Sequence, residues 1–284
     1  LFRRAVEDRL PMSAERRRVT AEKLEGRNRT LAAEERARRQ DAIARLEDFV
    51  RRYPDDPSYT PEALSRLAEL HYETASVDRG EAHPLGTDRP AEAAGPAAPG
   101  TRGCEAAIDL YQRLVAGFPG YEHKDGVYFL LGYCLAEVGK TAEAIRAYEE
   151  LVLRFPESGH VPAAWVRIGD LRFDEERPGS LQRAAEAYEK LLAWPDHPLH
   201  AHALYMLGWS RYRADDAARA QDAFARLLDH YVAASGKAGK PAQRDLWAEA
   251  IRDLAGCFAD PRAGAVRGAR TWFERLGGRP YEAL

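Results

Sequence analysis

Four aromatic-proline steps recur along this chain of 284 residues, and they constrain its fold more than any other feature. The steps are Tyr53-Pro54, Phe118-Pro119, Phe155-Pro156 and Trp194-Pro195, and the last three prolines are 37 and 39 residues apart. Proline lacks the N–H that a helix interior needs, and it disfavours the α conformation in the residue before it. Prolines at a regular interval therefore predict helices that end at that interval, which is typical of a repeat protein.

Small and large side chains occupy fixed places before each of these prolines. A small residue lies twelve positions before the first three prolines and eleven before the fourth, namely Ala42, Ala107, Ala144 and Ala184. A large apolar residue follows four positions later (Leu46, Tyr111, Tyr148 and Tyr188) and another three positions after that (Phe49, Leu114, Leu151 and Leu191). A copy without its proline reads Ala220, Phe224 and Leu227. Spacings of three and four place these side chains on one face of a helix.

A second column precedes the first and contains glycine. Leu131-Gly132, Ile168-Gly169 and Leu207-Gly208 sit in helical patterns, with weaker copies at Leu67-Ala68 and Leu254-Ala255. Two antiparallel helices can cross closely where a Gly of one meets an Ala of the other, and we expect the aromatic residues to fill the space toward the next pair. No alternating strand pattern competes with these periods. The sequence therefore predicts an all-α fold of antiparallel helix pairs.

These columns resemble the tetratricopeptide repeat (TPR) family, whose unit is about 34 residues long. The resemblance covers roughly residues 41–284 and is strongest over 104–231, where three repeats follow one another. It implies a right-handed solenoid of antiparallel helix pairs. The units here are longer, at 37–39 residues, and they end in Tyr-Pro or Phe-Pro. In this they look like a bacterial cell-envelope subgroup, which includes the outer-membrane-assembly lipoprotein type and the Tol-Pal coordinator type.

The repeat columns and the breaks between them divide the chain into five segments. We expect a charged N-terminal helical segment with a first partial repeat at 1–52, a first-repeat helix at 53–75, a flexible Gly/Pro/Ala-rich insertion at 76–103, core repeats at 104–231 and a C-terminal repeat at 232–284.

Further detail is expected within these segments. The first is one or two helices with an interruption near Gly26. A second break at Ala233–Ala242 precedes a helix at 243–258, and a partner helix is expected at Val266–Leu276. The array then either continues past Leu284 or frays there.

Charge is nearly balanced overall but uneven along the chain. The 42 Lys and Arg residues and the 45 Asp and Glu residues give a formal net charge of −3, which argues against a nucleic-acid binder. Residues 1–40 hold 12 basic and 7 acidic residues (+5), and the remainder holds 30 and 38 (−8). We expect the basic front segment to be a solvated helix that caps the array; contact with anionic lipid, peptidoglycan or a partner helix is the alternative.

The hydropathy of the chain predicts no membrane span. The longest apolar stretch, Val127–Ala136, is ten residues long, and a spanning helix needs about 20. The chain starts at Leu1 rather than Met, which leaves open whether a signal or lipoprotein sequence preceded it.

The resemblance also implies where a partner would bind. In the family, the side chains three positions before the Leu-Gly glycine and one after it line the concave face, so each pair shares one helical face. With two arginines expected at the rim, the candidate partner-binding groove comprises Phe129, Tyr133, Arg167, Asp170, Tyr205, Trp209 and Arg213. Equivalent positions are Val166 and, in the weaker first copy, Ser65 and Glu69. The alternative is that the longer repeats turn these side chains into the core.

The sequence shows no convincing catalytic or metal site, and we expect no cofactor. His197, His200 and His202 cluster, but His200 and His202 point to different faces of a helix, so we expect a polar turn between repeats rather than zinc ligation. Cys134 is expected to be a buried structural thiol, with a Cys104–Cys134 disulfide as the alternative.

These observations predict a non-catalytic scaffold that binds a peptide or helix of another protein. The resemblance implies a bacterial cell-envelope machine in the periplasm or at the outer membrane, with peripheral or lipid-anchored association left open. Outer-membrane assembly, Tol-Pal coordination, motility and secretion are the candidate machines. Two alternatives are a cytoplasmic TPR adaptor or regulator, and the non-catalytic arm of a larger protein.

Overall fold

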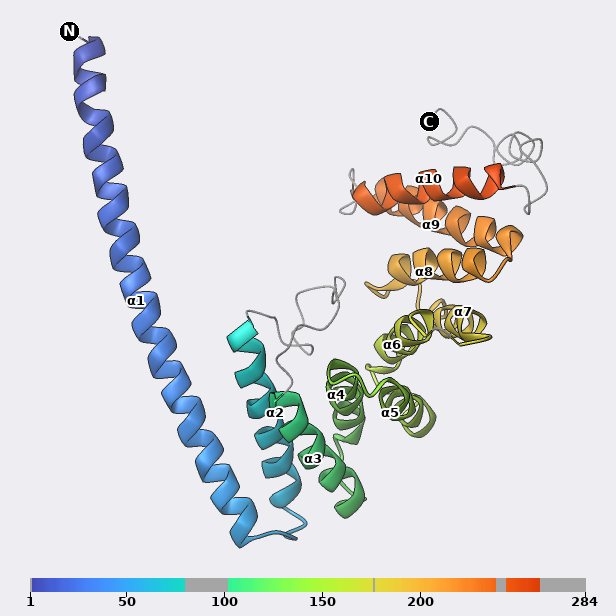
Figure 1. The fold of residues 1–284 in the computed structure, drawn as a ribbon, viewed down its shortest axis with the longest axis horizontal. Coiled ribbons are helices and arrows are strands. Elements are labelled where there is room, and N and C mark those ends of the chain that lie inside the picture. Colours follow the sequence, from blue (N-terminus) through green and yellow to red (C-terminus); the bar gives the residue numbers. More distant parts are fainter. Residues whose placement is uncertain (1, 80–101, 176, 239–243, 261–284) are drawn as a thin grey trace. The chain divides into compact units, whose positions relative to one another are not determined.

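The described part of the chain is helical throughout its regular structure (Figure 1). The structure is a computed structural model that describes residues 2–79, 102–175, 177–238 and 244–260. Within these ranges there is no strand. The helices are α1 (Phe2–Arg52), α2 (Thr60–Arg79), α3 (Arg102–Gly117), α4 (Lys124–Glu137), α5 (Thr141–Arg154), α6 (Val161–Phe173), α7 (Ser180–Leu191), α8 (His200–Arg213), α9 (Ala217–Ala238) and α10 (Arg244–Ala259). The predicted all-α solenoid of antiparallel helix pairs is confirmed.

Two compact units make up the chain. The first holds α1, α2 and α3, and the second holds α4 to α10. The sequence grouped the helix at 104–117 with the core repeats that follow it, whereas the structure packs α3 against α2 in the first unit.

The first unit begins with a single long helix. The interruption expected near Gly26 is wrong, because α1 runs unbroken from Phe2 to Arg52. One Gly in a helix interior costs the helix only about 1 kcal/mol relative to Ala. Ion pairs one turn apart, such as Arg38 with Glu34 at 3.5 Å, each favour the helix by about 0.2–0.5 kcal/mol.

Helices α2 and α3 form the pair of the first unit, with Leu64, Ala68, Tyr111 and Leu114 fully buried or nearly so. Helix α2 extends four residues past the predicted boundary at 75, and α3 begins two residues before Cys104. The two ends of the predicted insertion are therefore helical, and residues 80–101 lie outside the described part of the chain.

The second unit stacks helix pairs in chain order, α4 with α5, α6 with α7 and α8 with α9, and α10 packs on α9. Each second helix also contacts the first helix of the next pair. Tyr188 and Leu191 of α7, for example, share one core with Val166 of α6 and Leu207 of α8. Because each second helix packs against two neighbouring helices, the core is continuous along the array, as in a solenoid.

The glycine column lies at the crossing of the two helices within each pair. Each glycine lies against an aromatic ring of the second helix of its pair: Gly132 against Tyr148, Gly169 against Tyr188 and Gly208 against Phe224. A Cβ added to the glycine would come within 2.8 Å of the ring at Gly132 and within 2.6 Å at Gly169 and Gly208. The aromatic residues were expected to fill the space toward the next pair. Instead, each ring lies on the glycine of its own pair, because that glycine offers the one position without a side chain.

Two further expectations are corrected by the structure. Helix α9 continues into the predicted break at 233–242 as far as Ala238, and the rest of that break lies outside the described residues. Cys104, Cys134 and Cys257 are all free and buried, so the Cys104–Cys134 disulfide is wrong. Helix α10 agrees with the predicted helix at 243–258, and the expected partner helix at 266–276 lies outside the described residues. Within the described ranges, none of the helices combines the length and the apolar character needed to cross a bilayer.

Candidate protein-binding face

Six of the seven candidate groove residues lie on the first helices of the second unit with part of their surface open to solvent. We call this set the first-helix face; it comprises Tyr133 of α4, Arg167 and Asp170 of α6, and Tyr205, Trp209 and Arg213 of α8. Arg213 is exposed and the other five are half-buried. All six belong to one unit, so their mutual positions are part of a single packed array.

Phe129 differs from the other six, because it is only 5% exposed. Its ring packs edge-to-face on Tyr148 of α5 with centroids 5.7 Å apart and stacks on His160 at 5.2 Å. Val166 of α6, at the equivalent position, is also buried. For these two residues the structure agrees with the alternative interpretation, in which the side chain supports the array from within. Ser65 in the first unit is buried, whereas Glu69 is half-buried and pairs with Arg66 at 2.8 Å.

A chain of polar contacts links α4, α6 and α8 across the face. The Arg167 guanidinium lies over the Tyr133 ring, 5.6 Å from its centroid, and 3.9 Å from Asp170 Oδ2. On the other side, His202 Nε2 of α8 lies 3.6 Å from Asp170 Oδ1. Asp170 is therefore the central residue of this series of contacts. His202 was considered in the sequence only as part of a histidine cluster, and no periodicity marked it as a partner of Asp170.

The Tyr188 hydroxyl of α7 donates a hydrogen bond to Asp170 Oδ1 at 2.8 Å and so restrains this carboxylate. Burial, followed by the negative charge of Asp170, raises the pKa of Tyr188, so the hydroxyl keeps the proton it donates. A carboxylate held by a buried donor has a restricted orientation, which prepares its remaining lone pairs for a partner.

Arg213 forms a second bridge between α8 and α6. Its guanidinium lies over the Phe173 ring at 4.5 Å from the centroid. Nearby, the pKa of Asp174 is raised, mainly by burial and then by the charge of Asp170, while Arg213 acts in the opposite direction. Phe173 was not singled out in the sequence, although its place on α6 one helical turn after Gly169 is a signal that could have found it.

An aromatic cluster occupies the α8 end of the face. Trp209 packs edge-to-face against Tyr212, Phe224 and Tyr205, with centroid separations of 5.8, 6.3 and 6.5 Å. A small cavity of about 100 Å³ opens beside Trp209 and is lined by Trp209, Tyr212, Phe224, Arg252, Asp253, Gly256 and Cys257. The part of this wall that α10 contributes was not predicted from the sequence.

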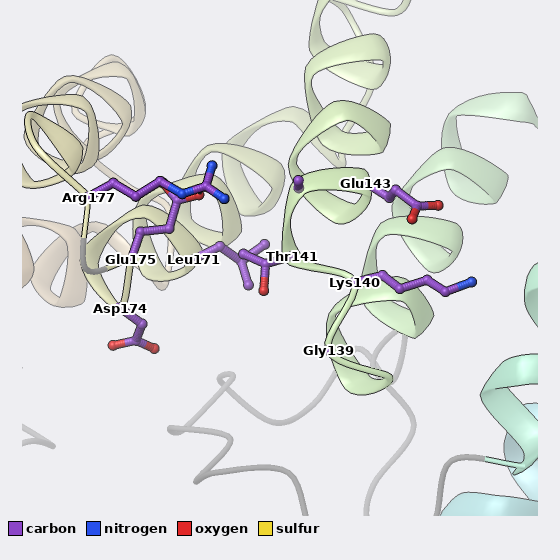
Figure 2. Close-up of a pocket in the computed structure, with 9 residues that line it drawn as sticks. Gly139, Lys140, Thr141, Glu143, Leu171, Asp174, Glu175 and Arg177 are labelled. Carbon is purple, nitrogen blue, oxygen red and sulfur yellow. The ribbon is translucent and has the colours of Figure 1, made fainter.

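A larger cavity of about 510 Å³ lies between the α4–α5 and α6–α7 turns (Figure 2). Its charged lining residues are Lys140, Glu143, Asp174, Glu175 and Arg177. Glu175 is already paired with Arg172 at 3.0 Å and Arg177 at 3.9 Å. Figure 2 shows Lys140 and Glu143 extending away from Asp174, so the charges diverge rather than converge on one position. This arrangement lacks the shared focus that general acid-base chemistry needs.

The histidine cluster is divided by the start of α8. His197 lies in the preceding turn, where its Nδ1 accepts the Leu199 N–H at 3.2 Å, and His200 is buried in the first turn of α8. The His200 ring packs against His230 of α9 at a centroid distance of 5.0 Å. Across the described residues, no group of three or more His, Cys, Asp and Glu side chains is arranged to hold a metal ion.

Two stretches of this chain match a known protein family. Residues 127–158 and 202–232 match the family model described as tetratricopeptide repeat. The first stretch covers most of α4 and all of α5, and the second covers most of α8 and α9. No curated protein matches this chain.

Solved structures are similar to this chain at low sequence identity, and three of them serve as examples. MamA (residues 41 to the end) from Desulfovibrio magneticus is 16% identical over 72% of this chain and 92% of its own, with a TM-score of 0.46. The C-terminal part of a TPR repeat-containing protein from Cytophaga hutchinsonii is 15% identical over 78% and 75%, with a TM-score of 0.47. BtubC from P. vanneervenii is 17% identical over 86% and 92%, with a TM-score of 0.46.

The pair between the two matched stretches, α6 with α7, has the same glycine-aromatic contact as its neighbours. The repeat geometry is thus continuous through the second unit. This chain is therefore similar to the tetratricopeptide repeat family at its α4–α5 and α8–α9 pairs.

Proposed function

We propose that the chain is a protein-protein interaction scaffold that holds a segment of a partner protein on the first-helix face, within a bacterial cell-envelope machine. Tetratricopeptide repeats are interaction modules whose interior is taken up by stacking and whose surface is free to bind. The proposed location is the periplasm or the outer membrane. The envelope setting is supported by the resemblance of the Tyr-Pro and Phe-Pro repeat ends to that subgroup.

The observation that carries the scaffold proposal is the contact chain across three successive first helices. Arg167 on Tyr133, His202 beside Asp170 and Arg213 on Phe173 hold half-buried side chains in defined orientations. Preorganised aromatic and guanidinium groups lose little entropy on binding, and such groups are common anchors of protein interfaces.

A site-specific cross-linking experiment tests this proposal. The photoreactive residue p-benzoylphenylalanine replaces Tyr133 on the first-helix face or, as a matched control, Leu153 of α5, which is 77% exposed. Illumination in cells of the source organism is expected to capture a discrete protein from position 133 and not from position 153.

The outcomes separate the two parts of the proposal. Identical products from both positions, or none from either, would overturn the scaffold assignment. A discrete cytoplasmic partner captured only at position 133 would retain the scaffold and overturn the envelope setting. A discrete envelope protein would support both.

A further inference from the structure

The small cavity at the α8 end of the first-helix face has aromatic walls on one side. Trp209, Tyr212 and Phe224 line it from α8 and α9, and the mutual edge-to-face contacts of these rings hold the indole in place. At about 100 Å³ the cavity is far smaller than a peptide. Since liquid water takes about 30 Å³ per molecule, the cavity has room for about three waters or for the head of one side chain.

The opposite wall, from α10, contains an unsatisfied acceptor. Asp253 lines the cavity, and its Oδ2 atom is buried without a hydrogen-bond donor among the described residues. A buried carboxylate oxygen without a donor is costly, and most such atoms in proteins are paired. Asp253 Oδ2 therefore calls for an N–H or O–H donor from outside the described residues.

The electrostatic surroundings of the cavity are negative. Burial, followed by the charges of Asp253 and Asp260, raises the pKa of the Cys257 thiol to about 11. Burial also raises the pKa of Tyr205. A hydrogen bond from the Trp209 indole N–H lowers this pKa, whereas the charge of Asp253, a hydrogen bond to Asp253 and the charge of Glu249 raise it further.

The neighbouring polar groups that the structure describes leave Oδ2 without a hydrogen-bond donor. Asp260 already accepts the Tyr212 hydroxyl at 2.9 Å. Arg252 is the one basic residue among the described lining residues, and it is exposed at the rim. The Tyr205 hydroxyl hydrogen-bonds to the Asp253 carboxylate, but none of the described donors reaches its Oδ2 atom.

We infer that this cavity receives an arginine side chain of the partner segment, with its guanidinium against the Trp209 wall and donating to Asp253 Oδ2. This inference rests on the proposed function and specifies one chemical group of the partner. Arginine fits better than lysine because its planar guanidinium stacks on aromatic rings and donates to carboxylates in a fixed geometry, whereas an ammonium is a compact and strongly hydrated charge. Charge complementarity and the unpaired acceptor thus select the same occupant.

Peptide titration of the full chain tests this assignment. The probes are acetylated, amidated pentapeptides of alanine with a central arginine, lysine or citrulline, where citrulline keeps the shape of arginine without its charge. The Trp209 indole N–H resonance, assigned with Trp209→Phe, reports occupancy. The arginine peptide is expected to bind at least about tenfold more tightly than the citrulline peptide.

Two substitutions locate the effect. Asp253→Asn is expected to bring the arginine and citrulline peptides to equal affinity. Asp222→Asn is the matched control, because it removes an α9 carboxylate whose side chain is 70% exposed and which pairs with Arg226 at 3.9 Å. The arginine preference should persist in this control.

Several results would overturn the assignment: equal binding of arginine and citrulline by the wild-type chain, equal binding of lysine and arginine, or no response of Trp209 to any peptide. The wild-type comparison does not depend on whether Asp253→Asn folds. A Trp209 resonance that ignores all peptides in the wild-type chain but responds to the arginine peptide once the arginines of residues 261–284 are replaced by glutamine would indicate one of those arginines in the cavity, and would also overturn a partner arginine.

The assignment of the cavity and the scaffold proposal can be overturned independently of each other. Loss of the arginine preference together with retained cross-linking at position 133 would overturn only the cavity assignment. An intact arginine preference without any cross-linked partner would overturn only the scaffold proposal.

Discussion

Gly169 of α6 lies directly against the ring of Tyr188 of α7, so that a Cβ on Gly169 would come within 2.6 Å of Tyr188 Cε1. Real Cβ atoms do not approach a ring carbon this closely. The glycine therefore sets the separation of the two helices, and the Tyr188 hydroxyl donates a hydrogen bond to Asp170 on the first-helix face. One packing contact thus determines both how the pair closes and how a candidate binding residue is oriented.

We expect Gly169→Ala to destabilise the second unit by about 1–3 kcal/mol, because overpacking a tight core costs this much and exceeds the gain of about 1 kcal/mol in helix propensity. Urea denaturation followed by circular dichroism would measure the change. Gly26→Ala in α1 is the control, since nothing lies within 4 Å of its Cβ position, and it should be neutral or stabilising. An equally stable Gly169→Ala protein would contradict the packing argument.

Two tyrosine-to-phenylalanine substitutions should have different effects on the free energy of unfolding. Tyr188→Phe removes a hydrogen bond to Asp170, and we expect a loss of about 1–2 kcal/mol in the free energy of unfolding. The Tyr148 hydroxyl is buried without a hydrogen-bond partner among the described residues, so Tyr148→Phe should be neutral or stabilising. Parallel urea titrations would test this contrast, and equal losses in both variants would refute it.

Stability should fall in mild acid through the His200–His230 pair. The pKa of each ring is lowered, chiefly because burial disfavours the imidazolium, and at His200 also by the charges of His230 and Arg226. The unfolded chain then binds protons near pH 6.5 before the folded chain does. The contribution of the pair is therefore complete above about pH 6.5 and is lost as the pH falls toward the lower folded-state pKa values.

His230→Phe tests this pH dependence, because it keeps an aromatic ring against His200 and removes one titrating group. The drop in the free energy of unfolding between about pH 7 and pH 5 should become smaller than in the wild-type chain. His123→Gln, at an exposed position before α4, is the control and should leave the drop unchanged. An unaltered drop in His230→Phe would show that other groups cause it.

The face residues should matter more for binding than for folding. Tyr133 and Arg213 make ring-guanidinium contacts at the surface, and removing them should change stability by no more than about 1 kcal/mol. Capture of the cross-linked partner should weaken at least about tenfold in the Tyr133→Ala, Arg213→Ala double variant. An Arg146→Ala, Leu153→Ala double variant of α5, which alters exposed positions, should retain capture. Undiminished capture by the first variant would count against the face.

Much of the fold follows from local spacing. The prolines and the columns of Ala, Gly and aromatic residues predict helix ends to within a few residues, as at α5, which ends at Arg154 before Phe155-Pro156. The continuity of α1 at Gly26 was missed because a single glycine is only weakly unfavourable in a helix. The orientation of the aromatic rings was also missed, because spacing along one helix does not reveal which neighbour a ring will meet.

On the first-helix face, too, the sequence predicted the positions of the residues but not which of their side chains are exposed. Phe129 and Tyr133 are four residues apart on α4 and were expected to point the same way, but Phe129 is buried and Tyr133 is half-buried. Their exposure depends on how α4 is rotated about its axis, which is decided by the fit of Gly132 against Tyr148. The unpaired Asp253 oxygen beside Trp209 depends on α8 and α10 meeting across 44 residues of sequence (253 − 209).

By itself the sequence determined that the chain forms helix pairs, where most helices begin and end, and which residues are small at their crossings, because these properties depend on hydrogen bonding and volume within one or two turns. Only the tertiary structure decided which side chains of a helical face remain open and which distant groups meet. That outcome depends on the rotation and separation of neighbouring helices, and both are set by close packing between residues far apart in the chain.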